Sequence, residues 1–151
     1  MRRRSTAGMV VVVLASAAQF VRLSATNPPV RGDLAASAEI KGALHHACYD
    51  CHSNETVWPW YSAVAPISWL IRHDVSEGRQ RLNFSDWAAY ESDPETAAQK
   101  LGQIASALTN GDMAPAYYRL LHADARLTTA QRDRVIRWAK QEEIKQRART
   151  D

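Results

Sequence analysis

The most constraining feature of this 151-residue chain is one short stretch that contains both of its cysteines. Cys48 and Cys51 are three positions apart, and His52 follows the second cysteine directly. C-x-x-C-H is the pattern for covalent attachment of a c-type haem. In that arrangement each thiol forms a thioether to one vinyl group, and the imidazole binds the iron as its proximal ligand. We therefore expect one haem c (covalent, with its iron), held by Cys48 and Cys51 and bound by His52.

A C-x-x-C pair has other uses, namely a disulfide, half of a zinc site, or a thioredoxin-like redox centre. Zinc would require two more ligands, but the chain has no further cysteine. His45 and His46 lie too close to the pair in sequence to complete an ordinary site. A thioredoxin-like centre requires β-strands, and no stretch alternates between apolar and polar residues with a period of two. The histidine after the second cysteine favours haem over all three.

The second axial ligand of the iron is predicted to be Met113. It is the only methionine outside the N-terminal segment, and it lies in a loop just before Pro115, where a side chain can point at a flat ring. A thioether ligand raises the haem potential and suits electron transfer. The alternatives are a methionine that only fills the core, or a histidine ligand. The competing histidines are His45, His46, His73 and His122.

Two tryptophans after the motif, Trp58 and Trp60, are possible haem contacts. Indole rings cover large apolar surfaces, and their N–H groups can donate hydrogen bonds to propionates. An ordinary aromatic core explains the same residues. Three arginines could also pair with propionates, although surface solvation is the more common fate of such side chains. They are Arg72, Arg79 and Arg81.

The N-terminus has the pattern of an export segment. Arg2, Arg3 and Arg4 precede an apolar run over residues 7–21, as in a signal sequence. The run is shorter than the ~20 residues that span a bilayer, so residues 1–24 are either a cleaved signal or an uncleaved membrane anchor. The arginines would stay in the cytoplasm. The expected location is the bacterial cell envelope, with the haem domain in the periplasm, either anchored in the inner membrane or released as a soluble form.

Charge argues against a nucleic-acid partner. The chain has 19 Lys and Arg residues against 16 Asp and Glu, but four of the arginines lie within residues 1–23, which leaves 15 basic residues (19 − 4) in the body. A near-neutral body lacks the basic stripe that binding to phosphates requires.

Helical spacing and capping signals dominate the remainder, which predicts an all-α fold, a small cytochrome c-like helical domain around one haem. After a linker at residues 25–33, Asp33 is expected to cap a helix from Leu34 to the motif. Further helices are expected from Pro66 to Gly78, around Trp87 and Tyr90, from Pro94 to Asn110, and from a capping box at Thr128 and Gln131. The predicted haem-binding domain spans residues 34–140, followed by a charged, fraying tail at residues 141–151.

The motif and its surroundings also resemble the bacterial haem-binding domain family, and the resemblance covers nearly the whole chain. It rests on Gln19-Phe20, Asn27-Pro28-Pro29, residues 48–54, Thr56, the block Trp58-Pro59-Trp60-Tyr61-Ser62, Ala65-Pro66, Ser68-Trp69, Gly78-Arg79, residues 82–87, Tyr118, Leu121-His122 and residues 125–128. It implies an exported monohaem c-type protein on an N-terminal membrane anchor. The family has Met-Pro-Pro where this chain has Met113-Ala114-Pro115, so the methionine is retained and the first proline is lost.

The expected function is that of a membrane-tethered electron carrier with an unidentified redox partner protein. Iron with two protein ligands has no open position for a substrate, so an enzyme is not expected. Two alternatives stay open: a haem-based sensor or haem enzyme with a labile sixth ligand, and an interaction domain in which haem supports folding.

Overall fold

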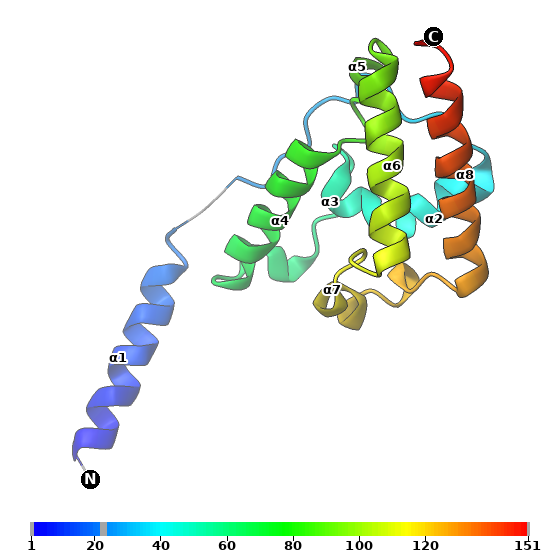
Figure 1. The fold of residues 1–151 in the computed structure, drawn as a ribbon. Helices are drawn as coiled ribbons and strands as arrows, with labels where there is room; N and C mark the ends of the chain where they lie inside the picture. Colours follow the sequence, from blue (N-terminus) through cyan, green and yellow to red (C-terminus); the bar gives the residue numbers. More distant parts are fainter. Residues whose placement is uncertain (1, 22–23, 151) are drawn as a thin grey trace.

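The computed structural model describes residues 2–21 and 24–150, and every regular element in these ranges is a helix. The predicted all-α class is therefore confirmed. Within the described residues, extended backbone pairs only at an isolated bridge between Gly32 and Asp86. The elements, drawn in Figure 1, are α1 (Arg2–Ala18), α2 (Ala38–Leu44), the π-helical turn η1 (His45–Tyr49), α3 (Asp50–His52), the 3₁₀ turn η2 (Trp60–Ala63), α4 (Ile67–Arg81), α5 (Trp87–Glu91), α6 (Pro94–Asn110), α7 (Ala116–Leu121), the 3₁₀ turn η3 (Ala123–Ala125) and α8 (Thr129–Arg147).

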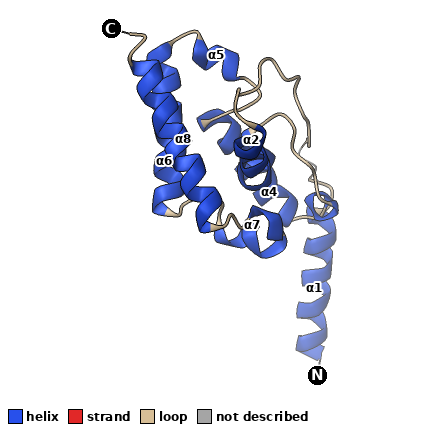
Figure 2. Cartoon of the chain, turned by 90° about the vertical axis from the view of Figure 1, so that its right-hand side faces the viewer, coloured by secondary structure: helices blue, strands red, loops and turns tan. Residues whose placement is uncertain are grey.

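The long helices α6 and α8 pack side by side and antiparallel (Figures 1 and 2). Asp93 caps α6 by accepting from the Glu95 N–H, and Gly111 ends it with a φ of 77°. Thr128 and Gln131 form the predicted capping box of α8. The apolar stripes of both helices meet α2 in one core, which includes Leu101, Leu108, Val135 and Ala139.

Three predicted helix boundaries are wrong. The helix expected to end at Gly78 continues to Arg81, since α4 keeps its helical backbone for three more residues. Asp33 does not begin a helix at Leu34, because the Leu34 N–H donates to the Phe84 carbonyl and holds this segment extended. The helix begins instead at Ala38, where the Ser37 hydroxyl caps it. At the other end of the chain, α8 does not fray after residue 140 but continues to Arg147, whose side chain pairs with Glu143 and Glu95.

The N-terminal apolar segment forms α1, which leaves the domain beside the start of α4 (Figure 1). Gln19 fixes this junction, because its side-chain N–H donates to the Ala65 carbonyl and its carbonyl accepts from the Ala65 N–H, both at 3.1 Å. Among the helices of residues 2–21 and 24–150, none combines the length and the apolar character that would mark a membrane span.

Candidate haem site

The C-x-x-C-H motif occupies the C-terminal end of one continuous helical segment, as the sequence predicts. The segment runs through α2, the π-helical turn η1 and α3, and ends at His52. Single π turns inside helices occur frequently at functional sites. Here the turn contains Cys48.

Tyr49, the residue after Cys48, fixes the inner side of the motif. Its ring is 2% exposed and stacks on Phe84, with ring centroids 4.8 Å apart. Its hydroxyl donates to Asp33 Oδ1 at 2.6 Å. Burial, together with this hydrogen bond, raises the pKa of the Tyr49 phenol far above its ordinary value. With Tyr49 held in the core, Cys48, Cys51 and His52 remain half-buried on the outer side.

Asp50 connects the motif to later parts of the chain. One of its carboxylate oxygens accepts from the Val57 N–H at 2.9 Å, and the other accepts from the Tyr118 hydroxyl at 2.6 Å. Burial, followed by this bond to Asp50, raises the pKa of the Tyr118 phenol. The contact ties α7, and with it the loop that contains Met113, to the motif.

His52 is oriented by the main chain of α4. Its Nδ1 lies 2.9 Å from the Gly78 carbonyl oxygen and 3.1 Å from that of Leu82. Carbonyl oxygens only accept hydrogen bonds, so Nδ1 carries the proton and the lone pair lies on Nε2. Burial lowers the pKa of His52, which favours the neutral form of the ring. A neutral imidazole that donates its other N–H to a carbonyl is the usual form of a metal-binding histidine.

Close contact between α4 and the motif depends on Gly78. A Cβ at this position would lie 2.4 Å from the Cys51 carbonyl oxygen. The next residue, Arg79, donates to the carbonyls of Ser53 and Thr26 and to the side chains of Asn27 and Thr56, at 2.7–3.0 Å. Arg79 therefore holds the segments that flank the motif and is not available to pair with a propionate.

Both cysteines carry free thiols. Burial raises the pKa of Cys48 and of Cys51 to about 12. At this pKa the thiols of the haem-free chain are protonated at neutral pH. Among the residues that the structure describes, no three His, Cys, Asp or Glu side chains gather in a group that could hold a metal ion.

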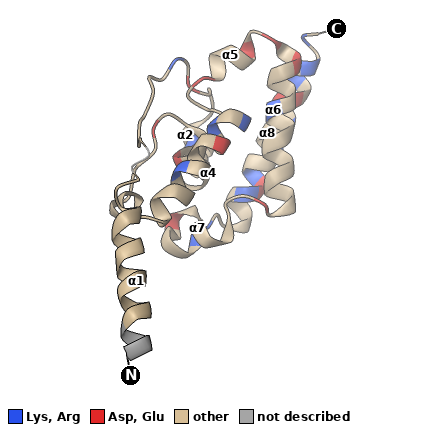
Figure 3. Cartoon of the chain, turned by 90° about the vertical axis from the view of Figure 1, so that its left-hand side faces the viewer, with Lys and Arg blue, Asp and Glu red and all other residues tan. Residues whose placement is uncertain are grey.

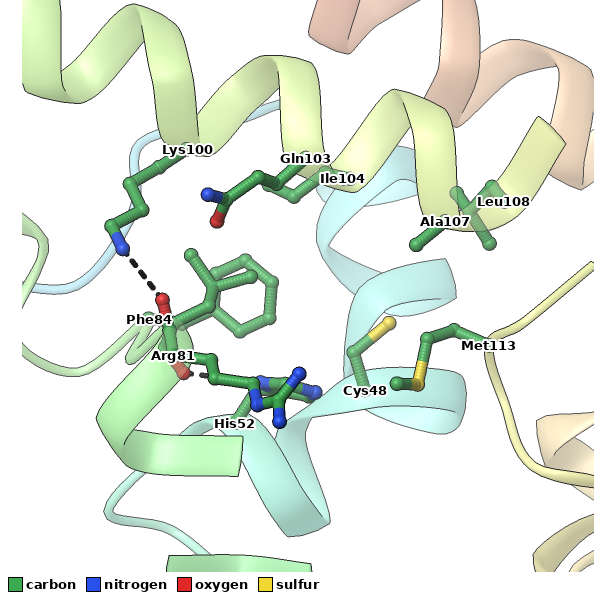
Figure 4. A pocket seen from close by; sticks show the side chains of 11 residues that line it. Cys48, His52, Arg81, Phe84, Lys100, Gln103, Ile104, Ala107, Leu108 and Met113 are labelled. Carbon is green, nitrogen blue, oxygen red and sulfur yellow. Dashed lines mark hydrogen bonds between the residues drawn. The ribbon is translucent and has the colours of Figure 1, made fainter. Parts of the chain in front are cut away.

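Two cavities open on either side of the motif and share Cys48, His52, Arg81 and Met113. The larger, about 430 Å³, lies between the motif and α6 (Figure 4). The smaller, about 260 Å³, lies towards α4 and α7 and adds Cys51 and His73. Binding sites for small molecules and cofactors are commonly 300–1,000 Å³. The two cavities, called the hollow below, are together lined by both thiols and by the predicted iron ligands His52 and Met113, a set of donors that suits a haem.

Met113 lines both cavities beside the motif, and its role as the second iron ligand stays a prediction. It follows α6 in a loop, is 36% exposed, and reaches towards Cys48 at the edge of the larger cavity (Figure 4). Of the competing histidines, only His73 lines either of these cavities. His45 stacks on Tyr49 on the proximal helix. His122 donates from Nδ1 to the Tyr118 carbonyl, so its Nε2 accepts from the Tyr61 hydroxyl at 3.2 Å.

The structure does not bring Trp58 and Trp60 to these cavities. The indole N–H of Trp58 donates to the Asn27 side chain at 3.1 Å, and Trp60 is 81% exposed. Arg72 does not line these cavities either, and its side chain donates to the Ser62 carbonyl. Of the three arginines considered from sequence, only Arg81 lines the hollow.

Sequence reasoning missed the residues that α6 contributes. Lys100 lines the larger cavity and donates to the Arg81 carbonyl at 2.6 Å. Gln103 and Ala107 follow on the same side of the helix (Figure 4). Lys100, Gln103 and Ala107 are three and four residues apart, a spacing that places them on one face of a helix. That face lies beside the more apolar one, which forms the core.

The family comparison agrees with this geometry. A family model described as a haem-binding domain matches residues 11–141, which include the motif, the cavities and Met113. A search of curated proteins found no match, and a search of solved structures found none either. Because the family model covers most of the chain, this protein belongs to the haem-binding domain family.

Proposed function

We propose that this haem-binding protein is a c-type cytochrome that binds one haem covalently and transfers single electrons in the cell envelope, tethered to the membrane by α1. The observation that carries the proposal is His52, whose Nε2 lone pair is left free beside two thiols and a methionine. When bound, haem supplies an iron that changes its charge by one electron. The chain supplies the attachment, the axial ligands and a shielded hollow.

Each residue has a defined part in this proposal. Cys48 and Cys51 would hold the haem through two thioethers, each formed when a thiol S–H adds across one vinyl group, with sulfur bonding to one vinyl carbon and hydrogen to the other. His52 donates from Nε2, while the carbonyls of Gly78 and Leu82 hold its ring. Met113 would supply the second axial ligand through its thioether, a ligand that favours electron transfer over ligand binding.

Covalent attachment is tested by replacing both cysteines with alanine in the full chain. We expect the wild-type protein to retain haem after denaturation and electrophoresis, and the variant to lose it. Bound zinc in place of haem in the purified wild-type protein would overturn the proposal.

The second candidate is a haem sensor or enzyme with a labile sixth ligand. It is favoured by the partial exposure of Met113 and by His73, which lines the smaller cavity. Absorption spectra of the oxidised protein separate the two functions. We expect a weak long-wavelength charge-transfer band that disappears in Met113→Ala and persists in His73→Ala. High-spin iron that binds carbon monoxide readily in the wild-type protein would favour the sensor or enzyme.

The envelope location is tested by fractionation. We expect the protein in the membrane fraction, accessible to protease only from the periplasmic side, with a mass that includes residues 1–23. A soluble periplasmic protein without these residues would support the cleaved form instead.

A further inference from the structure

An apolar surface lies at the end of the domain where α1 leaves it. Its members are large apolar residues from η2 and its flanks, from the first turns of α4 and from α7, each 42–81% exposed. This end patch consists of Val57, Trp60, Val64, Ile67, Leu70, Tyr117, Leu120 and Leu121.

The end patch is contiguous. Five of its members line a third cavity, of about 260 Å³, which adjoins the smaller cavity of the haem site and shares Cys51 and Tyr117 with it. Trp60 continues it through an edge contact with Tyr61, whose ring centroid is 5.7 Å away. Contiguous exposed apolar surface on a soluble domain marks a site that contacts a partner or a membrane.

We propose that the end patch docks on the surface of a lipid bilayer, an inference that rests on the proposed tether. The reciprocal bonds between Gln19 and Ala65 fix the end of α1 beside the patch, and the Trp69 indole N–H donates to the Val21 carbonyl at 3.2 Å. The apolar helix and the apolar patch therefore occupy the same end of the molecule (Figures 1 and 2).

The character of α1 favours a bilayer over a protein partner. Six consecutive large apolar side chains, at residues 9–14, are exposed, so the helix is apolar on all sides. Arg2, Arg3 and Arg4 begin the helix, and from Thr6 to Ala18 it carries no charged residue (Figure 3). A helix that is apolar all round belongs in a protein core or in a membrane.

Helix length explains why the domain would lie close to the lipid. The uncharged part of α1, residues 6–18, rises roughly 20 Å, compared with ~30 Å for the hydrocarbon core. A short apolar helix draws its flanking residues into the interface or thins the bilayer. Trp60, which is 81% exposed, suits that interfacial layer, where tryptophan is enriched.

The test uses the haem-loaded full chain in vesicles of phosphatidylethanolamine and phosphatidylglycerol, with hydroxyl-radical labelling read by mass spectrometry. Leu121 is 69% exposed and Ile144, at the far end of α8, is 68% exposed, so the two form a matched pair. We expect Leu121 to be labelled several-fold less than Ile144. In Leu121→Asp we expect several-fold more labelling at Ile67, and no such change in Ile144→Asp.

Three outcomes would overturn docking, and they differ in what else they affect. Equal labelling of Leu121 and Ile144 while the protein resists alkaline extraction would reject the patch and leave the tether. Complete alkaline extraction would reject the tether as well. Protection that disappears when the protein is diluted among more vesicles would show that a second copy covers the patch. The haem spectrum of the same sample reports on the site independently of all three.

Discussion

Gly78 has two roles at the scale of single residues. Its carbonyl accepts from His52 Nδ1 at 2.9 Å, and its missing side chain lets α4 approach the Cys51 carbonyl. The orientation of the predicted iron ligand and the close packing of the motif therefore depend on the same residue. Any residue would keep the carbonyl, so it is the close approach that requires glycine here.

Replacing this glycine should therefore disturb the domain. In Gly78→Ala the added Cβ would meet backbone 2.4 Å away, so we expect a loss of about 1–3 kcal/mol in the free energy of unfolding, measured with urea. The control is Gly42→Ala in α2, where an added Cβ meets nothing within 4 Å and a gain of about 0.4–1 kcal/mol is expected. Equal effects of the two substitutions would contradict the close packing.

Arg79 holds the chain on both sides of the motif through hydrogen bonds from all three of its guanidinium nitrogens. A lysine has one nitrogen and no planar fork, so Arg79→Lys cannot make these bonds together. We expect a loss of about 1.5–3 kcal/mol in the free energy of unfolding. Arg137→Lys, at an exposed position of α8, should change it by less than about 0.5 kcal/mol. An Arg79→Lys variant as stable as the wild-type protein would show that these hydrogen bonds are not needed.

At the scale of elements, α8 depends on its first turn. The Thr128 hydroxyl accepts from the Gln131 N–H, and the Gln131 side chain accepts from the Thr128 N–H. Thr128→Ala removes the first of these bonds and should cost about 1 kcal/mol, read from thermal unfolding. Thr129→Ala, one residue further and also exposed, should have little effect. Equal losses in the two variants would show that the cap is unimportant.

The parts of the molecule differ in how many of their residues are buried. Six residues of α6 are buried, whereas the structure gives no buried residue in α7 and only three in α4. Segments with few buried contacts open with lower free energies. In the haem-free protein we therefore expect amide hydrogens of α7 to exchange first and those of α6 last.

Attached haem should reduce this difference, because it would fill the hollow between Met113 and the motif. We expect hydrogen exchange followed by mass spectrometry to show slower exchange in α7 of the haem-loaded protein and little change in the buried centre of α6. Unchanged exchange in α7 would argue against a ligand role for the preceding loop.

Much of the fold was predictable because its signals are local. A capping box, a proline at the first position of a helix and a glycine after its end act within a few residues, so α6 and α8 begin where the sequence predicts. The prediction that Asp33 caps a helix was wrong because it used the same kind of local signal. Its sequence looks like a cap, but distant backbone at Phe84 holds the segment extended and its carboxylate binds Tyr49.

By itself the sequence determined the attachment motif, the helical class and the choice of Met113 as the candidate sixth ligand. Only the tertiary structure decided the tautomer of His52, the close approach of Gly78, the cavity wall from α6 and the placement of Trp58 and Trp60 outside the hollow. The physical reason is how far apart in the sequence the interacting residues lie. Covalent spacing and caps are fixed by neighbouring residues, whereas these four features depend on how segments 25 or more residues apart pack together.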